Sequence, residues 1–103
     1  WAMGVAVESV PRRSSLARAM RKIWALQLDW NHQYWALHVR PALLALEEDP
    51  RVIDIHLDYE AGKVTFCDVG RKVQILQLKA FFTERVFPYF WLQSEKTSIQ
   101  MLG

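Results

Sequence analysis

The fold of this chain is decided by the stretch from Val52 to Asp68, V-I-D-I-H-L-D-Y-E-A-G-K-V-T-F-C-D. Aliphatic and polar residues alternate over residues 53–57, and this period of two predicts a strand with one buried face. Gly62 can adopt the positive φ that a tight reversal needs. Residues 64–67 alternate again and are rich in β-branched and aromatic types. Two such strands joined by a short loop that contains glycine predict an antiparallel hairpin.

Composition limits the fold and the function. A chain of 103 residues is one domain or part of one. It is 51% hydrophobic and 13% aromatic, which is enough apolar surface for a core and argues against disorder. The formal net charge of +2 is too small for the chain as a whole to be a nucleic-acid binder. No apolar run approaches the roughly 18 residues of a membrane span, so no span is expected.

Two further features concern the context of the chain. The sequence begins at Trp1 rather than at a methionine, so we expect a fragment of a longer protein. Cys67 is the only cysteine, which excludes an internal disulfide and favours a reducing, cytoplasmic location.

Further strand patterns extend along the chain. We expect strands at residues 1–10, 24–28, 34–39, 73–78 and 98–102. A polar turn at 29–33 joins two of these strands. Residues 42–49 lie between two prolines and are expected to form a crossing loop that places its leucines on the core. Residues 81–91 form an aromatic run that Pro88 breaks. Six or seven short strands separated by turns predict an antiparallel sandwich or barrel.

A basic segment, residues 11–22, has two interpretations. Its cations are Arg12, Arg13, Arg18, Arg21 and Lys22. Leu16 and Met20 lie at helical spacing, so the segment is either an amphipathic helix or a solvated basic loop. These cations can contact phosphates, with Trp24 or Trp30 stacking on a base, so RNA binding is an alternative function.

Four motifs in the chain resemble the SPRY domain, which occurs as a PRY-SPRY module in tripartite-motif ubiquitin ligases and butyrophilins. The segments that carry the resemblance are L-D-Y-E-A-G-K-V-T-F at 57–66, W-A-M-G-V-A with E-S-V at 1–10, W-A-L-Q-L with Q-Y-W-A-L at 24–37, and F-T-E-R-V-F-P-Y-F at 82–90. These motifs have the family's order and span nearly the whole chain. Asp54 and Cys67 depart from the family, which usually has a glycine and an aromatic residue at these positions.

The resemblance implies an all-β fold, a two-sheet antiparallel β-sandwich of SPRY (concanavalin-like) type. Residues 1–103 would then be the C-terminal portion of the module, incomplete on its N-terminal side because the PRY strands and first SPRY strands are missing. In this sandwich we expect seven aromatic residues in the core: Trp1, Trp24, Tyr34, Phe66, Phe82, Phe87 and Phe90.

The family also implies a function. SPRY domains recognise peptides or folded proteins through variable loops at one edge of the sandwich, so we expect a protein or peptide target. The residues expected to contact it are Gln27, Asp29, Trp30, Asn31, Gln33, Trp35, Trp91 and Gln93. A tryptophan at a turn tip buries a large area and offers an N–H donor. The sequence is equally compatible with a Trp30 that folds back on the sheet.

Other kinds of site have less support. Three histidines and Cys67 match no catalytic or zinc spacing, so no catalysis, metal or cofactor is expected. Some butyrophilins bind phosphorylated metabolites in a basic pocket, but this chain has Met3 and Trp35 at two of its positions and keeps only Arg40. Ligand sensing of that kind is therefore a further alternative. The parent would be a cytoplasmic tripartite-motif ubiquitin ligase, with its catalytic domain and any oligomerisation elsewhere.

Overall fold

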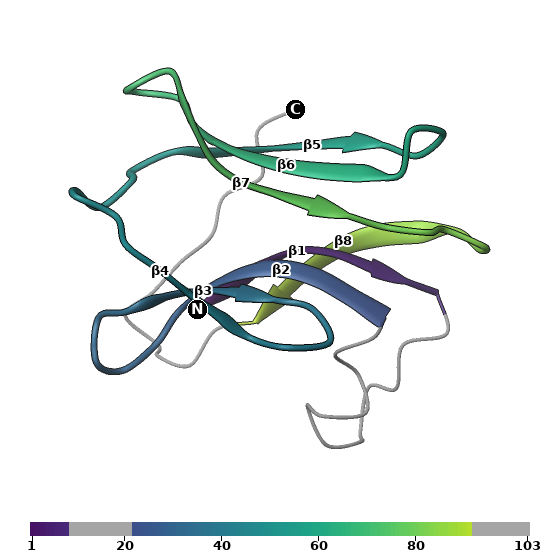
Figure 1. Cartoon of the computed structure of the whole chain (residues 1–103), viewed down its shortest axis with the longest axis horizontal. Coiled ribbons are helices and arrows are strands. Elements are labelled where there is room, and N and C mark those ends of the chain that lie inside the picture. The colour runs from purple at the N-terminus through teal and green to yellow at the C-terminus, as the bar shows by residue number, and fades with distance from the viewer. Residues whose placement is uncertain (9–21, 92–103) are drawn as a thin grey trace.

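The computed structural model describes residues 1–8 and 22–91, and every element in these ranges is a β-strand (Figure 1). The strands are β1 (Ala2–Val7), β2 (Ile23–Leu28), β3 (Tyr34–Leu37), β4 (Ala42–Leu44), β5 (Ile53–Asp58), β6 (Lys63–Asp68), β7 (Val73–Lys79) and β8 (Val86–Trp91). The strand expected at 98–102 and most of the basic segment lie outside the described residues.

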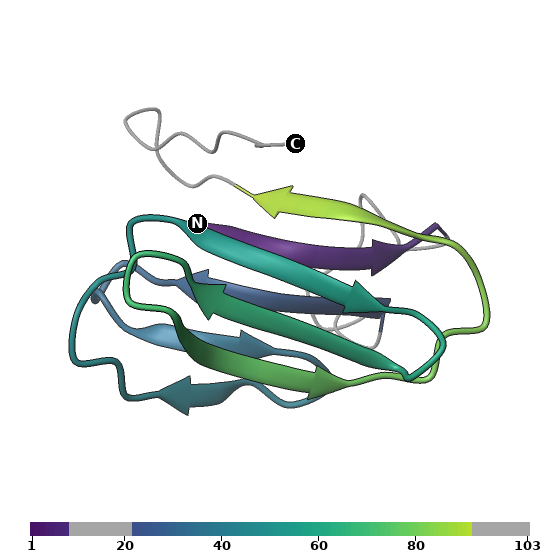
Figure 2. The same ribbon diagram turned by 90° about the horizontal axis from the view of Figure 1, so that it is seen from above.

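The strands form two stacked antiparallel sheets (Figures 1 and 2). The large sheet has the order β4-β3-β2-β1-β8, and the small sheet has the order β5-β6-β7. The predicted all-β sandwich is confirmed.

The predicted hairpin is β5–β6, paired from Ile53 opposite Asp68 to Asp58 opposite Lys63. Gly62 closes it with a φ of 68°, and a Cβ at this position would collide with the carbonyl oxygen of Ala80. The predicted hairpin is therefore confirmed, and it supplies two of the three strands of the small sheet, with β5 at an edge and β6 in the middle.

The main core lies between the sheets. Its buried residues are Val5, Val7, Trp24, Leu26, Tyr34, Val64 and Phe66. The predicted burial of Trp24, Tyr34 and Phe66 is therefore confirmed, and Trp1 packs against this cluster with its ring edge-on to Tyr34. Gly4 allows close packing of β1 on β2, because a Cβ here would overlap the backbone of Trp24 and Ala25.

A second apolar cluster lies on the outer face of the large sheet, because successive side chains of a strand point to opposite faces. Its buried members are Ala2, Ala6, Ile23, Ala25 and Leu37. Trp35 and Tyr89 pack against them and are half-buried. The large sheet thus has an apolar outer face as well as an apolar inner one.

Two expectations about chain path were wrong. Residues 42–44 are strand β4 rather than loop, because they pair with β3, with Ala42 opposite Ala36. Strand β8 continues through Pro88 because it is an edge strand, where a missing N–H can face away from the ladder.

Two predicted core residues on β8 are exposed for different reasons. Phe87 is paired with Ala6 and therefore lies on the outer face of the large sheet, whereas Phe90 is paired with Met3 and points to the inner face at the edge of the sheet. Phe87 is 46% exposed and Phe90 is 40% exposed. Figure 2 shows β8 as the outermost strand of the large sheet, on the side where β5 is the edge of the small one. Within the described chain, no strand lies beyond β8. Phe82, also expected in the core, is half-buried and packs on Trp24.

The two departures from the family pattern lie opposite each other. Asp54 on β5 pairs with Cys67 on β6, and Asp54 is exposed on the outer face of the small sheet. A carboxylate at this position keeps its hydration, so the substitution leaves the strand pairing intact.

Candidate functional site

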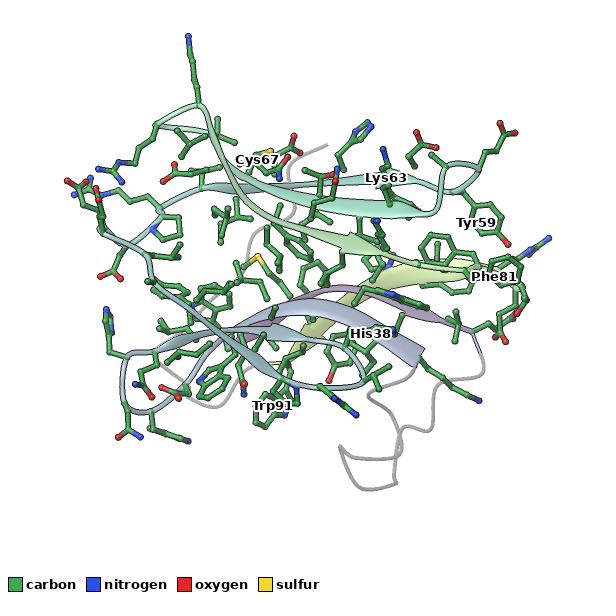
Figure 3. All side chains as sticks on the ribbon, in the orientation of Figure 1. His38, Tyr59, Lys63, Cys67, Phe81 and Trp91 are labelled. Carbon is green, nitrogen blue, oxygen red and sulfur yellow. The ribbon has the colours of Figure 1, made fainter. Side chains whose placement is uncertain are left out.

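One row of side chains crosses the outer face of the large sheet. Directly opposite residues of neighbouring strands point to the same face, and the register places Leu43, Trp35, Gln27, Ala2 and Trp91 in line. Trp91 is 42% exposed, and Figure 3 shows it on the side away from the small sheet. Three of the predicted contact residues therefore share one surface.

The loop that joins β2 and β3, residues 29–33, lies beside this row, one residue pair beyond Gln27 and Trp35. The Asp29 carboxylate accepts hydrogen bonds from the backbone N–H of Asn31 and of Gln33, both at 2.9 Å, and from Trp35 Nε1 at 2.8 Å. The hydrogen bond from the Gln33 N–H has the largest effect on the pKa of Asp29, followed by the bond from the Trp35 indole. Both bonds lower this pKa below its usual value. Asp29 therefore organises the loop, as expected for a turn aspartate whose side chain bonds nearby backbone groups.

The tip of the loop carries Trp30, whose side chain is 76% exposed. The structure thus decides between the two interpretations of this residue, because Trp30 does not fold back on the sheet. Asn31 and Gln33 are exposed beside it. Of the predicted contact residues, only Gln93 lies outside the described ranges.

A second carboxylate fixes the loop from outside. His32 Nε2 lies 2.9 and 2.8 Å from the two Asp49 oxygens, and the Tyr34 hydroxyl donates to Asp49 Oδ1 at 2.8 Å. The bond from His32, then that from Tyr34, lowers the pKa of Asp49. Burial, and then the bond to Asp49, raises the pKa of Tyr34.

Asp49 belongs to the segment 45–52, which connects the two sheets. The adjacent Glu48 forms an ion pair with Arg71 in the β6–β7 turn, at 3.0 Å. A hollow of about 510 Å³ lies between this segment, β4 and the loop, and its lining comprises residues 32–34 and 43–49. Neither His32 nor Asp49 was among the predicted contact residues.

The opposite end of the sandwich contains a stack of rings. Tyr59 stacks on Phe82 at 5.1 Å between ring centroids, Phe82 meets Trp24 edge-on at 4.9 Å, and Trp24 stacks on His38 at 4.9 Å. The Tyr59 hydroxyl donates to the Glu84 carbonyl oxygen at 3.0 Å. Phe81 is 89% exposed beside this stack (Figure 3).

The structure contradicts one part of the alternative hypothesis of RNA binding, the stacking of Trp24 on a base. Trp24 is only 4% exposed, so it cannot stack on a base. Lys22 precedes β2 at the end of the sheet remote from Trp30, so this cation and this ring do not share a site. The four arginines of the basic segment lie outside the described residues.

Within residues 1–8 and 22–91, no group of three His, Cys, Asp or Glu side chains is arranged to hold a metal ion. In the same ranges, no helix has the length and apolar character that crossing a membrane requires.

Comparison with known proteins identifies the family. Residues 1–103 match the SPRY domain. The chain belongs to the SPRY domain family. This SPRY domain is 38% identical to Tripartite motif-containing protein 10 of Mus musculus over 96% of the chain and 20% of that protein. The human protein of that name is 36% identical over 96% of the chain and 21% of its own length.

E3 ubiquitin-protein ligase TRIM58 of Homo sapiens is 32% identical, over 89% of the chain and 19% of its own length. The chain thus spans about a fifth of the length of these relatives. SPRY domains are protein-interaction modules rather than catalytic ones, so the chain is an interaction module of tripartite-motif type.

Proposed function

We propose that this SPRY domain binds a peptide or protein target with the loop 29–33 and the adjoining row of Trp35, Gln27 and Trp91. One observation supports this most: Trp30 is 76% exposed at the tip of a loop that two carboxylates hold in place. A large ring that is exposed before binding can bury its whole apolar face on contact.

The fixed loop makes this tryptophan a suitable anchor. Ordering a loop and its side chains during binding costs free energy, and a loop already held by hydrogen bonds avoids most of that cost. Aromatic anchors surrounded by polar groups are typical of interface hot spots. Asn31 and Gln33 supply such polar groups beside Trp30, while Trp35 and Trp91 extend the surface across the sheet.

A second part of the proposal concerns the longer protein to which this domain belongs. We propose that the domain is the substrate-recognition end of a cytoplasmic tripartite-motif E3 ubiquitin ligase. The support is the likeness to relatives of this type, one of them named a ubiquitin-protein ligase. The domain itself contributes binding energy, and ubiquitin transfer would take place on another domain of the parent.

The test is Trp30→Ala, with Phe81→Ala as its matched control, because Phe81 is equally exposed but lies at the other end of the sandwich. Partners of the parent protein are captured from cells and quantified by mass spectrometry. Trp30→Ala should reduce recovery of the target by about tenfold or more, the effect of a hot-spot residue. The thermal unfolding midpoint should stay unchanged in both variants.

Recovery that is unchanged in Trp30→Ala would contradict the proposal. So would an equal loss in both variants, because the effect would then not belong to the loop. A large fall in the unfolding midpoint of Trp30→Ala would show a structural residue instead.

A further inference from the structure

We propose that the hollow between β4 and the segment 45–52 receives an arginine or lysine side chain of the target. This inference rests on the proposed function and specifies the chemistry of the partner. The hollow adjoins the loop that carries Trp30, since His32 and Gln33 belong to both. A target bound at Trp30 would therefore lie next to the hollow.

The walls of the hollow are apolar on the side of β4. Leu44 and Leu46, which also pack against the main core, line it, and Leu43, which is 56% exposed and points to the other face of β4, belongs to the lining as well. An arginine or lysine can lie with its methylene stem along such a surface while its charged end extends beyond it. The hollow thus offers a place for the stem as well as for the charge.

The hollow has an excess of acidic groups. Its described lining contains the carboxylates of Glu47, Glu48 and Asp49 and the imidazole of His32, while Arg71 pairs with Glu48 from the β6–β7 turn. A concave surface with charges of one sign attracts the opposite charge and accelerates its arrival. The field at this end of the sandwich therefore favours a basic segment of the target.

The three carboxylates are not equally available. Both oxygens of Asp49 are engaged by His32, and Glu48 is paired with Arg71. Glu47 is exposed and has no ion pair within the described chain. Glu47 is therefore the acceptor for the incoming cation, and a planar guanidinium can bind its two oxygens together.

Other occupants fit this surface less well. An acidic segment would be repelled by the carboxylate of Glu47, and a purely apolar side chain would remove water from Glu47 without replacing its hydrogen bonds. A basic side chain with an apolar stem satisfies both the leucines and the carboxylate. The hollow thus selects the basic class of partner.

The test uses two peptides that differ only in charge, acetyl-Leu-Arg-Leu-amide and its citrulline analogue. Their binding to the 15N-labelled protein is followed by NMR. Amide shifts should centre on residues 43–49, and the citrulline peptide should bind about three- to fivefold more weakly, the effect of one exposed ion pair. Glu47→Gln should reduce binding of the arginine peptide to the level of the citrulline peptide.

The matched control is Glu60→Gln, which removes an exposed carboxylate from the β5–β6 turn at the other end and should leave binding unchanged. Equal binding of the two peptides would overturn the inference, as would an unchanged affinity in Glu47→Gln. Shifts centred outside the hollow would overturn it too.

The two proposals can fail separately. If Trp30→Ala loses the cellular target but the arginine peptide does not bind, the proposed function stands and the basic partner is wrong. If the arginine peptide binds in the hollow while Trp30→Ala keeps the target, the hollow binds a cation but the function assigned to the loop is wrong.

Discussion

The two ends of the sandwich are held together by different forces. At one end, the carboxylates of Asp29 and Asp49 fix the loop 29–33 through hydrogen bonds. At the other end, four rings from Tyr59 to His38 pack against one another. Each ring of the stack covers part of its neighbour, whereas Trp30 has no such contact and remains exposed.

This difference shows how a small domain can keep a tryptophan in water. A loop fixed by apolar contacts would have to turn its aromatic residue inward, because that residue would supply the contacts. A loop fixed by hydrogen bonds to carboxylates needs no apolar contact from its tip. Trp30 is therefore free to contact a partner, whereas the buried Trp24 stabilises the fold through its ring contacts.

The largest expected effect tests the stacked end. Trp24→Ala removes the ring that links Phe82 to His38 and should destabilise the protein by about 3–5 kcal/mol, the usual cost of a large aromatic in a core. Urea unfolding measures this. Trp30→Ala is the comparison and should stay within about 0.5 kcal/mol of the parent sequence. Similar values for the two variants would remove the contrast between the ends.

A smaller effect tests the loop end. Asp29→Ala removes the carboxylate that accepts three hydrogen bonds, two from loop amides and one from the Trp35 indole. The Asn31 and Gln33 amides should then exchange with solvent faster, on the order of tenfold. Hydrogen exchange by NMR measures this. The matched control is Asp58→Ala, because Asp58 accepts a single backbone bond, from Ala61, in the β5–β6 turn.

The control should leave exchange in the loop 29–33 unchanged. If Asp29→Ala altered exchange no more than the control does, the carboxylate would not be what fixes this loop.

The smallest effect is a dependence on pH. Because the pKa values of Asp29 and Asp49 are lower in the folded protein, both carboxylates stabilise the loop above the ordinary carboxyl pKa of 3.8. The stabilisation of the loop is lost as the pH falls below 3.8 and through the lower pKa that each of these two carboxyls has in the folded protein. The Trp35 indole N–H resonance should shift in this range, as Asp29 is protonated.

The stacked end supplies the reference for this titration. The ring resonances of Phe82 should not follow the same transition, because no carboxylate bond holds that ring. An indole resonance that stayed constant to pH 2, or that moved together with Phe82, would contradict the assignment.

Sequence reasoning succeeded where the signal was local. Alternation over residues 53–57 and 64–67 is a property of each strand, so the hairpin and the burial of Phe66 followed directly. The exposure of Phe87 and Phe90 was not predicted. The two residues lie three positions apart and so point to opposite faces of β8, and alternation cannot show that β8 is an edge strand. Sheet order depends on contacts between distant segments.

The site shows the same division. The loop 29–33 was predicted from its turn residues and its likeness to a family, but the bond from His32 to Asp49 joins residues 17 positions apart. His32 also has a φ of 60°, which is uncommon for residues other than glycine. No periodic pattern encodes such a contact, so Asp49 was found only in the structure.

The segment 45–52 has a mechanical consequence. Its Asp49 is attached to the loop of the large sheet and its Glu48 to the β6–β7 turn of the small sheet, both within three residues of Leu46. Sliding of one sheet over the other would therefore pull on the same short connection that positions His32. Tension between the layers of the sandwich would reach the Trp30 loop without any change in the strands themselves.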